Sequence, residues 1–453
     1  MSFPRYPDYK DSGVEWLGEV PGHWATPPLY LRYSVELGKM LDSSRITGDH
    51  LVPYLRNVDV QWGRINFDDL PEMDIEASEY GRYTVAPGDL LVCEGGEVGR
   101  AAIVPERSST IGFQKALHRL RALADDEHPA FMYFTLSWAA LRGVFNQGGL
   151  STIAHLTGEQ LRKYRFPKPP ITEQARIAAF LDRETAKIDA LVAEQQNLIA
   201  LLKEKRQALI SHAVTKGLDP DVRMKDSGVA WLGEVPAHWL ISPLKYLASS
   251  IKAGPFGSAL TKDMYVASGY RVYGQEQVIP GDFTVGDYYI SDGVFDELSQ
   301  YAVAPGDLLI SCVGTFGKIA IVPDDVEPGI INPRLIRLRV RSDVKAGFLC
   351  EVLRSQVVFE QFAVLSRGGT MDVINIGTLS NIYVPCPPFE EQQRILSFLA
   401  DSLMEIDSLV AEADATIALL KERRTALISA AVTGKIDVRH LSVASTVPTP
   451  EPA

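Results

Sequence analysis

The sequence contains no hydrophobic run that approaches the ~18 consecutive apolar residues of a membrane-spanning helix. Its first ten residues, MSFPRYPDYK, also lack the charged start and the apolar stretch of a secretory signal peptide. We therefore expect a cytoplasmic protein with no membrane partner.

Cysteine is scarce, with four residues in a chain of 453. The four form no CxxC pair and no spacing typical of a disulfide framework, so the sequence indicates neither a zinc site nor an oxidising compartment. We expect no metal in this chain and interpret the cysteines as buried thiols. They are Cys93, Cys312, Cys350 and Cys386.

A surplus of positive charge is also missing, because 45 lysines and arginines face 57 acidic residues and the formal net charge is −12. Proteins that bind nucleic acids usually carry a basic surplus that displaces counterions from phosphates. Net charge averages over the whole surface, however, and a basic patch can coexist with acidic flanks that meet other protein subunits. The charge balance alone therefore leaves a nucleic-acid partner open.

The chain is one unit written twice. The segment KDSGVEWLGEVPGHW, residues 10–24, returns as KDSGVAWLGEVPAHW at 225–239. The segment YTVAPGDLLVCEGGEVGRAAIVP, residues 83–105, returns as YAVAPGDLLISCVGTFGKIAIVP at 301–323. Each copy consists of a globular part followed by a long helical segment.

Within each globular part, apolar clusters such as VAPGDLLV and AAIVP alternate with turn residues, which is typical of short strands. Later stretches such as HPAFMYFTLSWAALRGVF space their apolar residues three or four apart, which predicts a helix. A proline cluster then fixes an extended exit before the long segment. The predicted fold class is α+β, with two similar mixed α/β domains separated by two long helices.

The long segments at 172–215 and 390–433 each carry apolar residues at alternating steps of four and three, which predicts a coiled-coil seam. Glu184, Gln195 and Lys205 interrupt the apolar stripe of the first segment. Because so narrow a stripe requires a partner helix, we expect the two segments to pack against each other. The apolar seam residues predicted for this spacer are Ile177, Leu181, Ile188, Leu191, Leu198, Leu202, Leu209, Ile395, Leu399, Ile406, Leu409, Leu420 and Leu427.

Both long segments begin acidic and end basic. Antiparallel packing places each acidic start beside the other's basic end and also pairs the helix dipoles, so we predict an antiparallel coiled coil with a pseudo-two-fold repeat. About 44 residues at ~1.5 Å each make a rod of roughly 65 Å. This length is close to two turns of duplex DNA at ~34 Å each. Two similar domains on such a rod suggest a ruler for DNA half-sites, although an adaptor that binds two proteins has the same geometry.

Four motifs together carry a family resemblance that covers nearly the full length: the doubled opening KDSGVxWLGEVPxHW, the doubled PxPPxxEQxxI before each long helix, the AVT ending of each helix, and GPFGSAL at 254–260. With these motifs the chain resembles the specificity subunit of a type I restriction-modification system. The resemblance implies two target-recognition domains that each read half of a bipartite, asymmetric double-stranded DNA sequence. It also implies that the helices set the spacing.

The same resemblance implies that two methyltransferase subunits bind this chain and supply S-adenosylmethionine chemistry on adenine. Restriction or translocase subunits that use ATP with Mg²⁺ join in some systems of this kind. This chain itself is expected to hold no cofactor and to be no enzyme. In agreement, we find no NPPY-like or DPPF-like tetrad, and GTFGKI around Lys318 lacks the GxxxxGK[ST] spacing of a phosphate loop.

The domain boundaries follow from the repeat and the resemblance. We place target-recognition domain 1 at 1–168, spacer helix 1 with its linker at 169–218, target-recognition domain 2 at 219–386, spacer helix 2 at 387–436 and a disordered tail at 437–453.

DNA-binding residues are expected where the two copies diverge, because side chains such as Arg, Lys, Asn and Gln supply the donors and acceptors that base edges and phosphates require. In the first domain the candidates are Lys39, Arg45, Arg56, Asn57, Gln61 and Arg64. In the second they are Lys252, Ser258, Lys262, Arg271, Tyr273, Gln275 and Gln277. The repeat register adds Gln114 and Lys115, opposite Asn332 and Arg334.

Two rival interpretations remain at this point. The chain could be a methyltransferase or nuclease in its own right, which the missing motifs disfavour. It could also be a protein adaptor that never contacts DNA.

Overall fold

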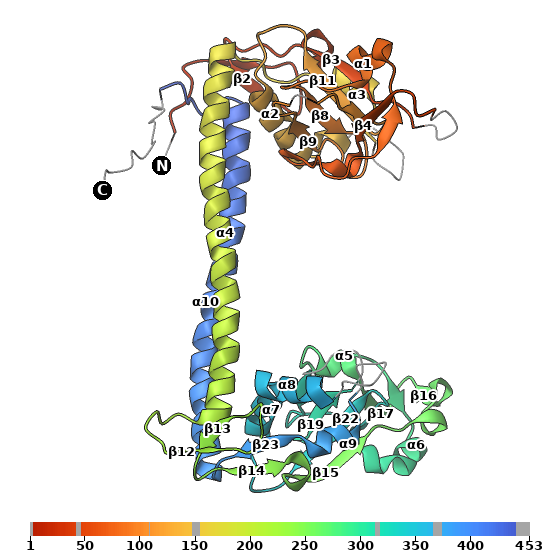
Figure 1. The fold of residues 1–453 in the computed structure, drawn as a ribbon, viewed down its shortest axis with the longest axis vertical. Coiled ribbons are helices and arrows are strands. Elements are labelled where there is room, and N and C mark those ends of the chain that lie inside the picture. Colours follow the sequence, from red (N-terminus) through yellow and green to blue (C-terminus); the bar gives the residue numbers. More distant parts are fainter. Residues whose placement is uncertain are drawn as a thin grey trace. The chain divides into compact units, whose positions relative to one another are not determined.

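The computed structural model describes residues 3–41, 47–107, 109–146, 155–312, 318–365 and 374–440. The chain forms two compact units, one made of Met1–Gln195 with Ala415–Ala453 and the other of Gln196–Asp414 (Figure 1). We call them unit 1 and unit 2. Candidate Arg45 and residues 441–453 of the predicted tail lie outside the described residues.

Unit 1 is built on an antiparallel four-stranded sheet in the order β3-β11-β8-β9 and a three-stranded sheet in the order β10-β4-β7. The strands of unit 1 are β1 Tyr9–Asp11, β2 Glu19–Pro21, β3 Tyr33–Leu37, β4 Leu51–Leu55, β5 Val60–Gln61, β6 Arg64–Ile65, β7 Glu72–Asp74, β8 Leu90–Cys93, β9 Ala101–Ile103, β10 Gly112–Phe113 and β11 Leu117–Ala122. Its shorter helices are α1 Tyr80–Tyr83, α2 Pro129–Leu141 and α3 Gly158–Lys163.

Unit 2 repeats this plan with sheets in the orders β15-β22-β19-β20 and β16-β18-β17-β21. Its strands are β12 Met224–Asp226, β13 Glu234–Pro236, β14 Leu240–Pro243, β15 Ala248–Ala253, β16 Tyr265–Val266, β17 Tyr270–Tyr273, β18 Tyr289–Ile290, β19 Leu308–Ser311, β20 Ile319–Ile321, β21 Gly329–Ile331, β22 Leu335–Val340 and β23 Tyr383–Cys386. Its shorter helices are α5 Gln275–Val278, α6 Asp292–Glu297, α7 Ala346–Arg354, α8 Gln356–Leu365 and α9 Ile376–Asn381. The predicted fold class, two similar mixed α/β domains with long helices, is confirmed.

The repeated APGD motif has the same structural role in both units. Asp89 accepts a hydrogen bond from the main-chain amide of Ala86 at 2.7 Å and closes the turn that precedes β8. It also binds the guanidinium of Arg121 on β11 through two bonds of 2.8 and 2.6 Å. Asp307 forms the equivalent pair with Arg339 in unit 2. A buried carboxylate thus ties a turn to the neighbouring strand, which explains why this motif occurs in both copies.

The two long helices are α4, Ile171–Lys216, and α10, Phe389–Val432. The predicted segments agree with these bounds to within one residue at each end. Gly217 ends α4 with φ of +76°, in the left-handed region where glycine is favoured. Its position is also tight, because an added Cβ would lie 3.2 Å from the ring of Trp239.

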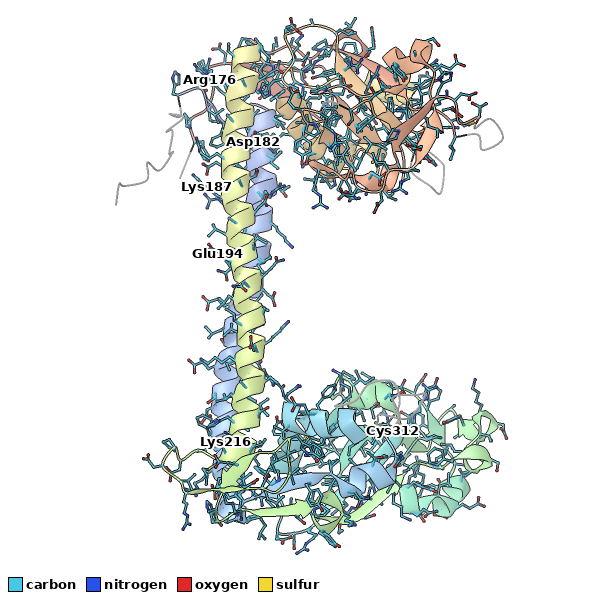
Figure 2. All side chains as sticks on the ribbon, viewed as in Figure 1. Arg176, Asp182, Lys187, Glu194, Lys216 and Cys312 are labelled. Carbon is cyan, nitrogen blue, oxygen red and sulfur yellow. The ribbon has the colours of Figure 1, made fainter. Side chains whose placement is uncertain are left out.

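Within each unit, α4 and α10 pack antiparallel. In unit 1 the early part of α4 meets the late part of α10, and Asp189 pairs with Arg424 at 2.9 Å. In unit 2 the late part of α4 meets the early part of α10, and Arg206 pairs with Asp407 at 3.4 Å. The acidic starts and basic ends therefore meet as the charge pattern predicts. Figure 2 shows Asp182, Lys187 and Glu194 along the same helix, α4.

The predicted seam is wrong at three of its leucines. Leu191, Leu198 and Leu409 are 45%, 42% and 42% exposed. On α4 the inward positions are instead one residue later, at Val192 and Ile199, which are half-buried. Adjacent apolar pairs such as Leu191–Val192 fit two alternating patterns equally well, and side-chain size does not decide between them.

The same shift by one residue changes which polar residues lie in the seam. Thr185, which is buried, takes the inward place assigned to Glu184, and Arg206 takes that of Lys205. Thr185 satisfies its hydroxyl within the helix by donating to the carbonyl of Leu181 at 2.7 Å. The heptad positions at Leu181, Ile188 and Leu202 are buried as predicted.

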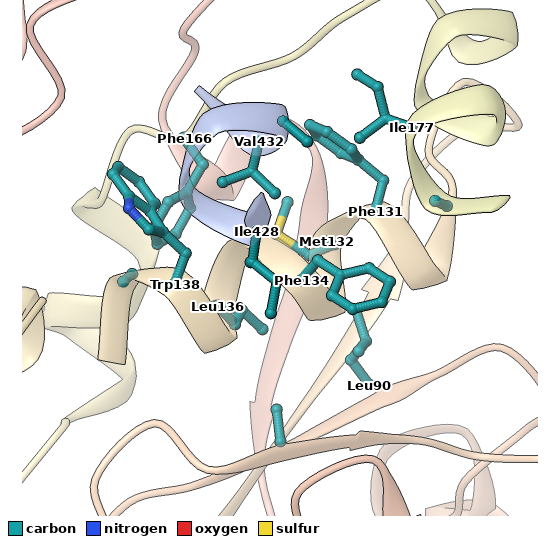
Figure 3. Close-up of a cluster of buried hydrophobic side chains, with 14 of the residues drawn as sticks. Leu90, Phe131, Met132, Phe134, Leu136, Trp138, Phe166, Ile177, Ile428 and Val432 are labelled. Carbon is teal, nitrogen blue, oxygen red and sulfur yellow. The ribbon is translucent and has the colours of Figure 1, made fainter. Parts of the chain in front are cut away.

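The core of unit 1 joins the domain to both long helices (Figure 3). Helix α2 is apolar around nearly its whole circumference, because it is covered on more than one side. Phe131 from α2, Ile177 from α4 and Val432 from α10 are all fully buried in one cluster. Burying each such side chain contributes about 1.5–3 kcal/mol, so truncating Phe131 to alanine is expected to cost about 3–5 kcal/mol.

A second junction forms around Glu173 in the first turn of α4. Its carboxylate accepts hydrogen bonds from the hydroxyl of Tyr6 at 2.5 Å and the indole of Trp24 at 3.0 Å, and it pairs with His23 at 2.8 Å. In unit 2, Glu391 pairs with His238 at 2.7 Å. The repeated histidine–tryptophan blocks therefore anchor each domain to the start of a long helix.

Residues 437–440 belong to this packed region rather than to the predicted tail. The main-chain amide of Asp437 donates to the carbonyl of Pro4 at 2.8 Å, and Val438 is 2% exposed. Arg176 on α4, labelled in Figure 2, donates to the carbonyl of Arg439 at 3.0 Å. Segments from both ends of the sequence thus close one unit.

Among the described residues, no helix is long and apolar enough to cross a membrane. In the same part of the chain, no group of three or more His, Cys, Asp or Glu side chains is placed to hold a metal ion. Cys93, Cys312 and Cys350 are buried free thiols, as predicted, and Cys386 is partly exposed.

Candidate nucleic-acid interface

Among its described residues, each domain contains one pair of parallel strands, and several predicted DNA-binding residues follow directly after the carboxyl ends of that pair. The pair is β4 with β10 in unit 1 and β17 with β21 in unit 2. Beyond the strands, the amide of Gln114 donates to the carbonyl of Leu55 at 3.0 Å. The amide of Asn332 donates to the carbonyl of Tyr273 at 2.8 Å. Gln114 and Asn332 therefore occupy equivalent positions, as the repeat register predicts.

A glycine lies beneath each of these positions. A Cβ added at Gly38 would collide with the carbonyl oxygen of Gln114, and one added at Gly254 would collide with that of Asn332. Both contacts involve main chain, which cannot move aside as the end of a side chain can. Gly254 is the first residue of the GPFGSAL motif, so this motif contributes to the fold by allowing the turn at Asn332 to approach β15.

A short helix follows the first strand of each pair. In unit 1 it is a 3₁₀ turn, Asn57–Asp59, and the amide of Arg56 donates to the Asp59 carboxylate at 2.7 Å. In unit 2 it is α5, and the amide of Gly274 donates to the side-chain oxygen of Gln277 at 2.7 Å. By this equivalence Asn57 matches Gln275. Both domains therefore place two amide side chains, Asn57 with Gln114 or Gln275 with Asn332, at the same site of the fold.

Two predicted cations of unit 1 have carboxylate partners within the domain. The ammonium of Lys39 lies 2.5 Å from Glu79, and this hydrogen bond lowers the pKa of the Glu79 carboxyl. The guanidinium of Arg56 binds both oxygens of Asp59, at 2.8 Å each. Partial burial raises the pKa of Asp59, but the hydrogen bonds and charge of Arg56 outweigh it and the net shift is downward. A contact from Lys39 or Arg56 to DNA would have to compete with these pairs.

The other candidates of unit 1 differ in how they are held. Asn57 is committed to the fold, because its amide donates to the carbonyls of Gly95 and Ala116 and its oxygen accepts from Arg100. Its predicted role as a base-reading side chain is therefore corrected to a structural one. The remaining four candidates are also at least partly exposed: Gln61 and Arg64 on the β5–β6 hairpin, and Gln114 and Lys115 after β10.

Three candidates of unit 2 are wrong because the domain buries them. Arg271 is 3% exposed and binds Glu327 at 2.6 Å. Tyr273 is fully buried, its hydroxyl donates to the Glu327 carbonyl, and burial raises its pKa to about 12. Gln277 is 1% exposed and caps α5. A base contact from any of them would require internal hydrogen bonds to break in the domain interior.

The remaining candidates of unit 2 divide into two groups. Lys252 is exposed on β15 and donates to Gln300 at 3.2 Å, and Ser258 is exposed on the short 3₁₀ helix Gly257–Ala259. The second group surrounds one pocket of about 690 Å³, which also contains Gly274, Val272 and Pro333. The candidates that line it are Lys262, Gln275, Asn332 and Arg334. The structure thus brings four of the nine described candidates of unit 2 together around one pocket.

The pocket contains residues that the sequence reasoning missed. Tyr265 and Tyr288 line it with ring centroids 5.3 Å apart, and Glu276 adds a carboxylate. Aromatic faces and donors together are typical of surfaces that bind nucleic acid. The sequence does place Gln275 and Glu276 near tyrosine-rich segments, and this closeness was the one hint of the pocket. The sequence does not reveal how the strands in those segments pair. Arg100, which fixes Asn57 in unit 1, was missed for the same reason.

A family described as the type I restriction modification DNA specificity domain matches residues 35–200 and 259–411, more than half of the chain. Among curated proteins, the EcoBI type I restriction enzyme specificity subunit of Escherichia coli is 22% identical over 360 residues, covering 78% of this chain and 75% of that protein. The StySPI specificity subunit of Salmonella potsdam is 21% identical over 441 residues, covering 92% and 90%.

Solved structures show the same fold. A chain from work on complex assembly and conformational transition of the type I R-M system aligns with a TM-score of 0.72 at 17% identity, covering 91% of this chain and 98% of its own. The HsdS subunit from Thermoanaerobacter tengcongensis aligns with a TM-score of 0.56 at 18% identity, covering 92% and 98%.

Proposed function

The chain belongs to the type I restriction-modification DNA specificity domain family, and we propose that its two domains each read one half of a split, asymmetric DNA target. The family role is DNA sequence recognition. The prediction that this chain is a specificity subunit and not itself an enzyme is confirmed by the family match and by the curated relatives, which are specificity subunits. The division of the target between two domains is the proposal.

One observation carries this proposal. The two domains share a fold and even the position of an amide pair, yet the charged and aromatic residues around that pair differ. Unit 1 places Lys39 and Arg56 there, each paired with a carboxylate, whereas unit 2 places Lys262 and Arg334 beside two tyrosines. One scaffold that presents two different sets of donors is expected to select two different sequences.

We also propose that the long helices set the gap between the half-sites. Helix α4 has 46 residues, which at ~1.5 Å per residue corresponds to about 69 Å. Two turns of duplex DNA span about 68 Å. A stiff helix is a better spacer than a flexible loop, because its length does not fluctuate.

The same proposal includes partner subunits. The repeated opening segments, which carry the partly exposed side chains of His23 and His238, give the chain two similar surfaces, which suits the binding of two copies of one methyltransferase subunit. Those subunits would bind S-adenosylmethionine and methylate adenine, and restriction subunits would bring ATP with Mg²⁺. Surfaces that dock on partners of opposite charge offer a reason for the net charge of −12.

The proposal is tested by sequencing methylated adenines in cells with and without this gene. We expect one split motif to disappear with the gene, and an unchanged pattern beside an active partner methyltransferase would refute recognition. Exchanging residues 25–165 for those of a homologue should then change one half of the motif only. An insertion at Gly217 should change the gap or abolish activity while leaving both halves intact; a changed half would contradict the spacer role.

A further inference from the structure

The pocket of unit 2 combines three elements that are distant in the sequence. The 3₁₀ helix Lys262–Met264 supplies Lys262, the start of α5 supplies Gln275 and Glu276, and the turn between β21 and β22 supplies Asn332 and Arg334. Strands β16 and β17 and helix α5 can be followed in Figure 1. The pocket lies at the carboxyl ends of the parallel pair, where the divergent residues of the two domains gather.

The turn at Asn332 holds its side chain in one orientation. The side-chain oxygen of Asn332 accepts a hydrogen bond from the main-chain amide of Arg334 at 2.9 Å. Its NH₂ group lies against Gly274, where it would be 2.6 Å from an added Cβ. With the oxygen engaged by the main chain, Asn332 presents mainly its two N–H donors to the pocket.

Two cations line the same pocket as this amide and have no partner among the described residues. Arg334 and Lys262 are exposed, and neither side chain forms an ion pair or hydrogen bond with any residue that the structure describes. This distinguishes them from Lys39 and Arg56 of unit 1, which are paired with carboxylates. The pocket therefore offers the N–H donors of Arg334 at the turn between β21 and β22. Glu276 contributes a carboxylate to the same pocket.

A guanine is the base that matches such a set of donors. In the major groove it presents two adjacent acceptors, N7 and O6, whereas adenine presents an acceptor beside a donor and cytosine presents a donor. We propose that the Asn332–Arg334 turn is the specificity-determining contact of the second domain and that it selects a guanine in the half-site which this domain reads. This inference rests on the proposed function.

Unit 1 is not expected to make the same contact. The register that matches Gln114 with Asn332 matches Lys115 with Pro333, so the predicted pairing of Lys115 with Arg334 is wrong. Ala116, which has φ of +114° and no polar side chain, lies opposite Arg334 instead. Arg56, the nearest arginine after β4, is occupied by Asp59. Replacing Arg334 should therefore alter one half of the target and leave the other unchanged.

The experiment uses the full chain assembled with its methyltransferase subunits. The binding of a duplex that carries the methylated motif is compared, by fluorescence anisotropy, with the binding of duplexes substituted at each G·C pair of the second half. For Arg334→Ala we expect a loss of about 5- to 150-fold on the motif duplex and little further loss when one particular G·C pair is replaced. Asn332→Ala should relax the same pair, and Arg334→Gln guards against a folding defect of the alanine variant.

Arg341→Ala is the matched control, because Arg341 is an exposed arginine that follows β22, the strand that Arg334 precedes, and it pairs with Asp343. It should leave discrimination intact. If Arg334→Ala weakened every duplex by the same factor, Arg334 would be a phosphate contact and the inference would be overturned. Undiminished discrimination would overturn it as well. If the wild-type assembly showed no preference for the motif, the proposed function itself would fail, which separates the two outcomes.

Discussion

A buried ion pair in unit 1 and its replacement in unit 2 permit a sharp test of the energetics. The guanidinium of Arg32 binds both oxygens of Glu127, at 2.7 and 2.6 Å, and both side chains are 1% exposed. In unit 2 the matching turn and loop place Leu247 and Val344 there, which are 9% and 5% exposed. The same fold position is thus ionic in one domain and apolar in the other.

Removing one partner should be costly. After Arg32→Leu, Glu127 would remain buried, and its polar partners among the described residues would be the hydroxyl of Tyr33 at 3.2 Å and the ammonium of Lys168 at 3.2 Å. An uncompensated buried charge typically costs about 3–5 kcal/mol, and the residual contact with Lys168 favours the lower end, about 3 kcal/mol. We expect Glu127→Val to cost a similar amount, because it leaves the arginine buried.

The double change Arg32→Leu with Glu127→Val should recover most of this loss. Replacing a buried ion pair by apolar residues is often neutral or stabilising by about 1–4 kcal/mol. Two main-chain acceptors, the carbonyls of Phe166 and Pro167, would lose their bonds to Arg32 at about 1 kcal/mol each, so a net change within about 2 kcal/mol of zero is expected. The coupling energy of the cycle should therefore be about 3 kcal/mol or more.

The measurement is urea unfolding of the full chain, followed by tryptophan fluorescence, for wild type, both single variants and the double variant. Glu159 and Lys163, an exposed pair at 2.6 Å in the same domain, provide a control cycle in which almost no coupling is expected. Additive effects of Arg32→Leu and Glu127→Val would refute the reasoning, since they would show that each charge is stabilised independently of the other.

Three further predictions concern stability and reactivity. Replacing Asp307 by asparagine should destabilise unit 2 by about 2–4 kcal/mol in urea unfolding, because the buried carboxylate both closes the APGD turn and binds Arg339; an effect below 0.5 kcal/mol would exclude this role. The hydrogen bond from Arg439 lowers the pKa of Asp437 in the folded chain, so this pair contributes stability that is present above the ordinary value of about 3.9 and is lost as the pH falls through the lower folded pKa. The protection of the main-chain amides of residues 436–440 against hydrogen exchange, taken relative to the intrinsic exchange rate at each pH, should accordingly fall in acid, and Asp437→Asn should show the reduced protection already at pH 7. Burial raises the pKa of the Cys350 thiol to about 12, so at pH 8 iodoacetamide should alkylate it only when the domain unfolds, and rapid labelling in the folded chain would contradict its placement.

The architecture of this chain was predictable because the repeat supplies its own alignment. Two copies of APGD and of PxPPxxEQ mark corresponding turns and helix starts, and the bounds of α4 and α10 follow to within one residue. Helix orientation was predictable because it depends on the sign of charge at each end, which the sequence shows directly. The choice between Leu191 and Val192 at the seam was not, because it depends on a shift of one residue that periodicity does not resolve.

The site was predicted in outline but not residue by residue. Gln114 and Asn332 were found through the repeat register, whereas Arg271, Tyr273 and Gln277 were chosen for their polar chemistry alone. All three side chains form hydrogen bonds inside the domain. They are buried because β17 pairs with β18 and with β21, and β21 lies about 60 residues further along the chain. Polar side chains fulfil structural roles as readily as binding ones, and only tertiary contacts separate the two.

The way in which the sequence is divided between the two units has a consequence for biosynthesis. Unit 2 is continuous in the sequence, from Gln196 to Asp414, whereas unit 1 includes residues from 415 onward, and Ile428, Ala431 and Val432 fill its core. Domains generally fold as units during synthesis, with the N-terminal one first. Here the order is reversed, because the first domain to leave the ribosome cannot close its core until α10 is nearly complete. During that interval we expect the apolar faces of α2 and of the early part of α4 to stay exposed until α10 packs against them.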